Sequence, residues 1–275
     1  MVAESGGRGI IVHFNKIKVL PSSKKYLFIV MKPLLLKLTI SGKNFILWLR
    51  PSIFMGWIKS FLLLVAYTLY LSKWIRKENK TLKFNDFFVF KRRYHKRELL
   101  YEHVVKQQNL EDETIDYFEF GVAACGSFKW WLTRLTDGNN NFYGFDTFEG
   151  LPEHWGVYKA GDMSYNIPII DDDRAKFFKG LFQDTLLPFL KRYSIEREDN
   201  RRKVIHLDAD LFSSTLFVLA SLYPYLNVGD ILFFDEFNVP KHEFLAFKVF
   251  SESFYIKFET LGAVNNYFQV AFMVK

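Results

Sequence analysis

The fold of this chain is decided by Val204-Ile205-His206-Leu207-Asp208-Ala209-Asp210-Leu211-Phe212-Ser213-Ser214-Thr215. An apolar run of strand length ends in two acids at alternate positions, and a helix-start signal follows at once. Because side chains alternate along a strand, Asp208 and Asp210 are expected to face the same way at its carboxyl end. Open α/β sheets bind ligands at that end of their strands, so the stretch predicts a site as well as a strand.

The same pattern returns one helix later, in Gly229-Asp230-Ile231-Leu232-Phe233-Phe234-Asp235-Glu236-Phe237-Asn238. If the two strands are neighbours in a sheet, four carboxylates meet at one edge. Carboxylates held together raise each other's pKa unless a cation or a proton-transfer role compensates. The hypothesis for the site is therefore this edge, formed by Asp208, Asp210, Asp235 and Glu236.

Strands and helices are expected to alternate regularly from Asp116 onward. Strands separated by single helices predict an α/β fold with a doubly wound, mostly parallel, Rossmann-like sheet. The expected strands end or lie near residues 117–121, 142–146, 182, 204–208, 231–235, 255–260 and 267–274. The expected helices cover about 127–135, 185–190, 213–223 and 241–253. A long polar excursion follows the second strand.

The length of 275 residues allows one α/β domain, expected at residues 101–275, and an α-helical, hydrophobic extension at residues 1–100. The net charge is +7, and basic residues greatly outnumber acids between Lys16 and Arg97. Beside hydrophobic runs, this charge favours contact with an anionic membrane over contact with nucleic acid, for which no binding signature is present. The single cysteine, Cys125, excludes an internal disulfide framework and fits a cytoplasmic location.

Residues 1–30 are expected to be loosely ordered, with Met31 as an alternative start of the protein. They lack the order of cationic, apolar and small residues that a signal peptide has. The stretch from Ile53 to Leu71 is nearly all apolar, and residues 44–77 as a whole could contact a membrane surface. A central Lys costs about 2.5–3.5 kcal/mol on insertion scales, but Lys59 lies a third of the way along and could snorkel.

Three interpretations of residues 53–71 stay open: a helix on the membrane surface, a helix packed on protein, and a true span. Residues 77–97 are basic and aromatic, and are interpreted as a connector with a solvated or lipid-facing basic face. A helix near residues 99–105 is expected to lead into the domain.

The first expected strand ends in a glycine turn, Glu119-Phe120-Gly121-Val122-Ala123-Ala124-Cys125-Gly126-Ser127. Glycines let a ligand approach the backbone, and a helix amino terminus favours carboxylate or phosphate. The turn lacks the Gly-Lys-Ser/Thr of a P-loop and the second glycine of the dinucleotide pattern. Asp146 follows Gly126 by twenty residues, where an acid accepts hydrogen bonds from ribose hydroxyls. Together these features favour an adenosine-type cofactor.

Five blocks in this order resemble the macrocin O-methyltransferase (TylF-type) family. They are Glu119-Phe120-Gly121-Val122, Gly144-Phe145-Asp146-Thr147-Phe148-Glu149-Gly150-Leu151-Pro152, Gly180-x-Phe182-x-Asp184-Thr185-Leu186, His206 to Thr215, and Asp235-Glu236-Phe237. The resemblance covers roughly residues 100–275. It implies a class I, S-adenosylmethionine-dependent enzyme that methylates sugar hydroxyls with the help of Mg²⁺.

By this resemblance, Asp208, Asp235 and Glu236 would hold the metal and Asp210 would be the catalytic base. The implied cofactor residues are Glu119, Gly121, Gly126, Ser127, Asp146, Thr147, Phe182 and Asp208. The sequence departs from many relatives in having Glu236 in place of an Asp and Cys125 in place of a glycine. A cation on neighbouring sugar hydroxyls would lower their pKa while a carboxylate takes the proton, and oxygen ligands suit Mg²⁺.

Simpler roles compete for several of these residues. Asp210 could cap the helix that follows it. His154 lies in the polar excursion, where it could assist proton transfer as a catalytic residue or be an ordinary surface histidine. His206 and Cys125 are interpreted as structural.

Two other functions remain open at this point. Asp208-Ala209-Asp210 could hold a nucleotide sugar in a metal-dependent glycosyltransferase, or the chain could be a membrane-associated relative that has lost catalysis. The expected partner is a small-molecule or glycan acceptor of unknown identity, and a homo-oligomer is a further possibility.

Overall fold

A computed structural model describes residues 22–196 and 201–275 of the chain. Contacts along the backbone divide the chain into two compact units, Met1–Lys59 and Ser60–Lys275. The expected division between residues 1–100 and 101–275 stays a prediction about which part folds independently.

The described part of the first unit is helical. Helix α1 covers Ser22–Leu49, and α2, Ser52–Glu78, begins in this unit and continues into the next. Apolar side chains of α1 such as Leu38 and Trp48 are exposed. The prediction of loose order for residues 1–30 is wrong for residues 22–30, which belong to α1. The other residues of that prediction, 1–21, lie outside the described residues.

In the second unit, α2 changes character along its length. Side chains from Phe61 to Leu64 are exposed, whereas Leu71, Trp74 and Ile75 belong to the hydrophobic core of the unit. Among the described residues, Ile58–Glu78 is the one helical stretch long and apolar enough to cross a membrane, which on its own is weak evidence for a span.

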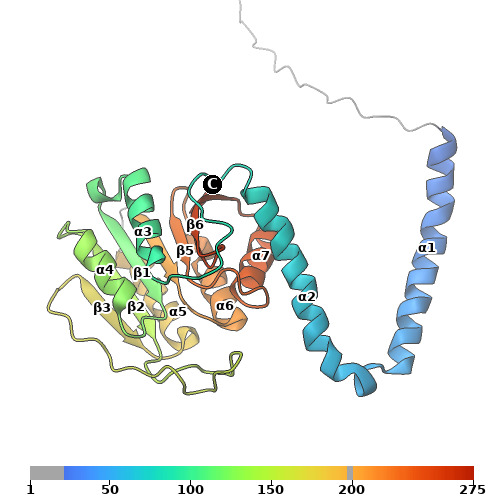
Figure 1. Ribbon diagram of the computed structural model, residues 1–275, viewed down its shortest axis with the longest axis horizontal. Coiled ribbons are helices and arrows are strands. Elements are labelled where there is room, and N and C mark those ends of the chain that lie inside the picture. The colour runs from blue at the N-terminus through green and yellow to red at the C-terminus, as the bar shows by residue number, and fades with distance from the viewer. Residues whose placement is uncertain (1–21, 197–200) are drawn as a thin grey trace, which may run out of the picture. The chain divides into compact units, whose positions relative to one another are not determined.

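The second unit is built on a seven-stranded sheet with the order β3-β2-β1-β4-β5-β7-β6 (Figure 1). The first five strands in this order are parallel, and β7 pairs antiparallel with β5 and β6. The strands are β1 Ile115–Phe120, β2 Asn141–Asp146, β3 Ala175–Lys179, β4 Arg202–Leu207, β5 Ile231–Phe234, β6 Phe258–Val264 and β7 Gln269–Val274. The predicted α/β, mostly parallel sheet is confirmed.

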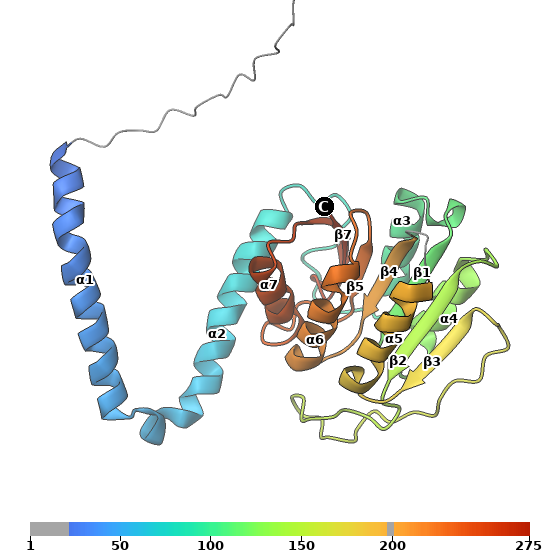
Figure 2. The ribbon, with the colours of Figure 1, turned by 180° about the vertical axis from the view of Figure 1, so that it is seen from behind.

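Helices cover both faces of this sheet (Figures 1 and 2). One face carries α3 and α4, and the other carries α5, α6 and α7. Their bounds are α3 Lys96–Gln107, α4 Gly126–Arg134, α5 Phe182–Glu196, α6 Phe212–Leu222 and α7 Glu243–Ser253, with short 3₁₀ turns at Leu110–Asp112 and Tyr223–Tyr225.

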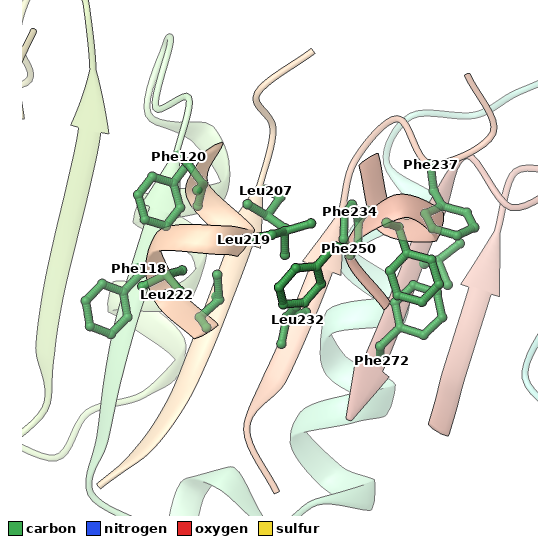
Figure 3. Packing of buried hydrophobic residues seen from close by; sticks show 14 of the residues in the cluster. Phe118, Phe120, Leu207, Leu219, Leu222, Leu232, Phe234, Phe237, Phe250 and Phe272 are labelled. Atoms are coloured by element: carbon green, nitrogen blue, oxygen red, sulfur yellow. The ribbon is translucent and has the colours of Figure 1, made fainter. Parts of the chain in front are cut away.

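Each face has its own hydrophobic cluster, because side chains of the buried strands alternate between the two. In β1, Tyr117 packs on the side of α3 and α4, whereas Phe118 and Phe120 pack on the side of α5 and α6. Figure 3 shows Phe118, Phe120 and Leu207 beside Leu219 and Leu222 of α6. This packing fixes the carboxyl ends of β1 and β4 next to each other.

Two strands differ from the prediction. The third strand ends at Lys179 rather than near Phe182, because Gly180 takes a positive φ of 143° and α5 begins at Phe182. The strand expected at 255–260 begins at Phe258, since Tyr255 with its φ of 55° completes the end of α7.

The segment 84–97, here called the basic strap, lies against the carboxyl-terminal strands. Its backbone is held by the amide oxygens of two asparagines: Val89 N–H donates to Asn266 Oδ1 (2.8 Å) and Arg93 N–H donates to Asn265 Oδ1 (2.9 Å). The connector is therefore anchored to the sheet through its backbone, while the basic side chains of Lys91, Arg92 and Arg93 are exposed; contact of this face with lipid stays a prediction.

Candidate active site

A cavity of about 470 Å³ opens at the carboxyl ends of the parallel strands. Its walls come from the glycine turn, the strand ends, the basic strap, the polar excursion and the start of α5. The residues that line it include Arg92, Tyr94, Gly121, Ala123, Asp146, Thr147, Trp155, Tyr158, Tyr165, Phe182, Asp208, Asp210, Ser214, Glu236 and Phe268.

The glycine turn can form only because residue 121 lacks a side chain. Gly121 has a φ of 92°, and a Cβ on it would lie 1.9 Å from the carbonyl oxygen of Asp208. Such a contact is far inside van der Waals distance, and L-residues rarely adopt this φ. Gly121 therefore allows the turn after β1 and the first residue after β4 to touch, which brings the two halves of the site together.

Asp146 ends β2 and faces the cavity from a fixed position. Its Oδ2 accepts a hydrogen bond from Ala123 N–H (2.8 Å) and its Oδ1 accepts one from Phe148 N–H (2.7 Å). Each carboxylate oxygen can accept a second bond, so acceptor capacity remains for ribose hydroxyls. Thr147 and Phe182 line the same side of the cavity, as the resemblance implied.

Glu119 lies beneath the glycine turn, away from the cavity. It is fully buried; its Oε1 accepts from Ser127 Oγ (2.6 Å) and its Oε2 from Tyr117 OH (2.5 Å), and burial raises its pKa to about 8. Glu119, Gly126 and Ser127 are not among the residues that line the cavity. Their direct contact with a cofactor stays a prediction.

The four acids of the predicted edge do lie on neighbouring strands, because β4 and β5 pair in parallel with Leu207 opposite Phe234. Burial and the nearby Asp235 raise the pKa of Asp208 well above its ordinary value. Burial and Asp235 also raise the pKa of Asp210 to about 7, and burial and Asp210 raise that of Glu236 to about 8. Burial and mutual repulsion thus disfavour the state in which all carboxyl groups of this edge are charged at once.

The carboxyl of Asp210 does not cap a helix. Helix α6 has Leu211 as its N-cap residue, with no side-chain hydrogen bond at the cap. Asp210 itself has a φ of 55°, which turns the chain between β4 and α6, and it lines the cavity. The competing interpretation as a helix cap is therefore wrong.

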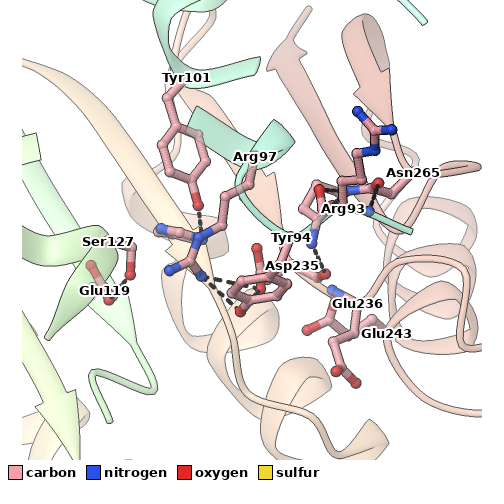
Figure 4. A network of polar contacts seen from close by, with 12 residues as sticks. Arg93, Tyr94, Arg97, Tyr101, Glu119, Ser127, Asp235, Glu236, Glu243 and Asn265 are labelled. Carbon is pink, nitrogen blue, oxygen red and sulfur yellow. Dashed lines mark hydrogen bonds and ion pairs between the residues drawn. The ribbon is translucent and has the colours of Figure 1, made fainter. Parts of the chain in front are cut away.

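Two residues of the basic strap region reach the acidic edge (Figure 4). Tyr94 OH donates to Asp235 Oδ2 (2.6 Å), and Arg97 Nη1 lies 3.5 Å from the same oxygen. The Arg97 guanidinium also lies over the Tyr94 ring, 4.2 Å from its centre, and donates to the Tyr94 hydroxyl (2.7 Å). Since Arg97 stays protonated, it is the internal counter-charge for the buried Asp235.

One local signal for this pair is its spacing: Tyr94 and Arg97 are three residues apart where a turn leads into α3, and such a spacing can bring two side chains together. Their partner lies about 140 residues away in the chain, so only the fold reveals the contact.

Several acid oxygens at the edge have no protein partner. Among the described residues, buried Asp235 Oδ1, Glu236 Oε2 and Glu243 Oε1 accept no hydrogen bond. Such oxygens are the donors that a hard cation prefers. Yet no three acidic, histidine or cysteine side chains in the described part of the chain are arranged to hold a metal, and Tyr94 and Arg97 already occupy the other oxygen of Asp235. The donors fit Mg²⁺ in kind, and their arrangement is incomplete.

His206 and Cys125 are both buried in the domain. His206 is fully buried, with its ring nitrogens 3.3 Å from Tyr101 OH and 3.0 Å from Tyr117 OH, and burial lowers its pKa to about 3. Cys125 is buried and free, and burial raises its thiol pKa to about 11. The structural interpretation of both is confirmed.

His154 is exposed and does not line the cavity; its Nδ1 accepts from Ala160 N–H (3.2 Å). Its role in proton transfer stays a prediction that this placement does not support, and a surface histidine is the simpler description.

The comparisons with known proteins concern the fold and the family of the chain. CalS11, a calicheamicin methyltransferase, has a similar structure with a TM-score of 0.51 at 19% identity, over 76% of this chain and 91% of that one. The O-methyltransferase NovP gives a TM-score of 0.48 at 20% identity, over 66% of this chain and 78% of the other. No curated protein sequence matches the chain. The family model of macrocin O-methyltransferase (TylF) matches residues 88–267, so the chain belongs to this family of S-adenosylmethionine-dependent O-methyltransferases.

Proposed function

We propose that the enzyme transfers a methyl group from S-adenosylmethionine to a hydroxyl of a sugar or glycan-like acceptor, with Mg²⁺ bound at the acidic edge. The observation that carries this proposal is that Asp208, Asp210 and Glu236 line one cavity with the glycine turn, while Asp235, buried and not lining the cavity, lies near Asp208 where the paired strands β4 and β5 end. An enzyme that transfers a methyl group to a hydroxyl needs the cofactor site and the acids that activate the hydroxyl within one cavity.

The cofactor would lie over the glycine turn. Asp146 would accept hydrogen bonds from the ribose hydroxyls, and the ring of Phe182 would contact the apolar part of the nucleoside. Gly121 lines the cavity, and its missing side chain lets the glycine turn pack against the backbone of Asp208. Thr147 holds the turn after β2, because its Oγ1 donates to Gly150 O (2.7 Å).

Asp210 is the proposed catalytic base. It lines the cavity, and its carboxyl accepts no hydrogen bond from the described residues, so its oxygens are available to a substrate hydroxyl. A pKa of about 7 lets it be charged near neutral pH while still taking up a proton readily. A sugar hydroxyl is a poor nucleophile. Transfer of its proton to Asp210 while its oxygen attacks the methyl group of S-adenosylmethionine would make it reactive enough.

Asp208, Asp235 and Glu236 are the proposed Mg²⁺ ligands. The unpartnered Asp235 Oδ1 and Glu236 Oε2 support this assignment, because a divalent cation would satisfy both. When bound, Mg²⁺ supplies the positive charge that lowers the pKa of sugar hydroxyls and orients them. Asp235 would offer the ion its free Oδ1, since Tyr94 and Arg97 contact its Oδ2.

The acceptor would enter past the polar excursion. Trp155 and Tyr158 line the cavity with their rings stacked 5.4 Å apart at an angle of 12°. Flat aromatic surfaces of this kind suit the apolar face of a sugar ring. The comparisons support neither a glycosyltransferase nor an inactive relative.

Methyl transfer from radiolabelled S-adenosylmethionine to a panel of nucleotide sugars and glycans tests the proposal, with Mg²⁺ and with EDTA. We expect transfer that EDTA suppresses and Mg²⁺ restores. Transfer that is indifferent to EDTA would remove the metal and keep the methyltransferase. Cofactor binding without transfer to any acceptor would favour an inactive relative.

A second proposal concerns location. We propose that the enzyme is cytoplasmic and contacts a membrane through residues 44–77. Exposed apolar side chains on α1 and on α2, such as Leu47, Trp48, Phe61 and Leu62, support this proposal because water does not favour such a surface. Co-sedimentation of the full chain with lipid vesicles tests it, and recovery of all protein in the supernatant would refute it.

A further inference from the structure

A second cavity, of about 490 Å³, lies between the carboxyl-terminal half of α2 and helix α7, away from the candidate active site. Its apolar wall is formed by Trp74, Phe244 and Phe247, and Trp74 and Phe244 lie 6.3 Å apart. Its rim is basic and carries Lys73, Arg76, Lys77, Lys80 and Lys248. We call this cavity the α2–α7 groove.

The positive charge of this groove is largely uncompensated. Glu252, the one acid that lines it, forms an ion pair with Lys248 (2.6 Å), and Glu78 lies 3.9 Å from Lys77. Within residues 22–196 and 201–275, Lys73, Arg76 and Lys80 form no ion pair, and all three are exposed.

The cations gather at the carboxyl-terminal end of α2. Lys73 and Lys77 are four residues apart in the helix, Arg76 lies in its last turn, and Lys80 follows its end. A cluster of exposed cations with few acids nearby attracts an anion from outside the protein.

The chain just before the groove is apolar and exposed. In α2, Phe61 is 64% exposed, Leu62 55% and Leu69 66%. An apolar helical stretch followed by a cluster of lysine and arginine is the pattern of a segment that enters lipid and meets the charged headgroups at its end. Tyr70, at the transition, lines the groove with the Lys248 ammonium 5.3 Å from its ring centre.

From these contacts we propose that the α2–α7 groove binds the phosphate headgroup of an anionic membrane lipid, while the apolar part of α2 before it enters the acyl layer. The inference rests on the proposed membrane contact and adds its chemistry. The lysines and Arg76 meet the phosphate, and the aromatic wall contacts the glycerol and the first carbons of the chains. The headgroup thereby fixes the side of the enzyme that faces the membrane.

Vesicle flotation with the full-length protein tests the proposal. The vesicles are either neutral phosphatidylcholine alone or phosphatidylcholine with phosphatidylglycerol. We expect strong binding only to the anionic vesicles, weakened by salt. The variant Lys73→Glu/Arg76→Glu should lower this affinity about 25-fold or more, because each basic residue near an anionic surface contributes about fivefold. In this variant the new Glu at position 73 lies four residues before Lys77 in α2, which favours the helix.

The matched control is Lys176→Glu/Lys191→Glu, which changes exposed lysines elsewhere and alters the net charge equally, by two per residue. The control should bind like the unmodified protein. If both variants lose affinity equally, only the net charge matters. If the groove variant binds as tightly as the unmodified protein, the groove is not used. Either result overturns the proposal.

The remaining outcomes separate the two membrane proposals. Equal binding to neutral and anionic vesicles would overturn the headgroup site and leave membrane contact standing. Binding to neither would overturn both. Free glycerol 3-phosphate serves as a soluble competitor: if millimolar amounts displace the protein from anionic vesicles, the groove takes a soluble phosphate ester and the lipid assignment is wrong.

Discussion

The two halves of the candidate active site are built in opposite ways. On the side of β1 and β2, the acids are satisfied by the protein: Asp146 accepts two backbone N–H groups and Glu119 accepts two hydroxyls. On the side of β4 and β5, buried oxygens of Asp235 and Glu236 have no partner among the described residues. The first half is preorganised to hold a ligand, and the second stores unsatisfied negative charge.

This difference indicates a division of labour. A satisfied and rigid half suits a cofactor that must be held in one orientation. A half with raised pKa values and open acceptors suits proton transfer and a cation, since perturbed carboxyls cluster where chemistry occurs. Arg97 lies between these halves: it is 3.5 Å from Asp235, and a Cβ on Gly126 would lie 3.4 Å from its Nη2.

Loss of the base should have the largest effect. We expect Asp210→Asn to lower kcat about 10²–10⁴-fold, because general-base catalysis contributes on this scale, while cofactor affinity changes little. In the unmodified enzyme kcat/KM should rise with pH, since Asp210 acts only when charged; Mg²⁺ bound nearby would move the apparent pKa below the value of about 7 that burial and Asp235 give without metal. Steady-state kinetics between pH 5.5 and 9 measure both effects. A variant that keeps full activity would assign the base elsewhere.

Removal of the internal counter-charge comes next. We expect Arg97→Gln to lower the free energy of unfolding by about 3 kcal/mol, at the lower end for a broken buried pair, because Asp235 can take up a proton instead. Urea unfolding measures the change. Tyr94→Phe should cost about 1 kcal/mol, the usual value of one hydrogen bond. The exposed Arg93→Gln is the control, and a loss as large as that of Arg97→Gln would show that general charge is responsible.

The cofactor half should respond through affinity. We expect Asp146→Asn to weaken S-adenosylmethionine binding about 10–100-fold, since charged acceptors contribute about 1.5–3 kcal/mol per hydrogen bond. The loss of cofactor-induced thermal stabilisation measures this change. Asp162→Asn, at an exposed acid of the polar excursion, is the matched control. Unchanged stabilisation in Asp146→Asn would contradict the assignment of the ribose site.

The smallest expected effect concerns how the free energy of unfolding depends on pH. Burial raises the pKa of Glu119 to about 8 from an ordinary value of 4.5, so the folded state holds a proton that the unfolded state has lost. The contribution is fully present below pH 4.5 and is lost as the pH rises to 8. In Glu119→Gln, without cofactor, the fall of stability over this range should be less steep by about 1.4 kcal/mol per pH unit. Glu98→Gln, at an exposed acid, should keep the original slope.

Much of this comparison was predictable from the sequence. The alternation of strands with helices identified the sheet, and acids at strand ends placed Asp146, Asp208, Asp210, Asp235 and Glu236 at one edge, because parallel strands all end on the same side. Element type follows from local periodicity, which a single sequence shows directly.

Other features depend on distant contacts. Asp235 meets Tyr94 and Arg97 only because the basic strap lies against β5 and β7, and nothing in residues 84–97 encodes that partner locally. Glu119 shares a strand with apolar side chains, so its burial away from the cavity follows from the packing of α4. Helix α2 has an exposed apolar half and a half that packs on the domain; of the three open interpretations, packing on protein describes the second half, and the two membrane interpretations stay predictions.

The central claim is that the satisfied half of the site binds the methyl donor beside the acidic half. Calorimetric titration of the full chain with S-adenosylmethionine tests it most directly, first without metal and then with Mg²⁺ and a sugar acceptor analogue. The account predicts one cofactor site per chain, competed by S-adenosylhomocysteine, with acceptor binding that requires the acids of β4 and β5 and fails in Asp208→Asn. Absence of cofactor binding, or acceptor binding that survives Asp208→Asn unchanged, would contradict it.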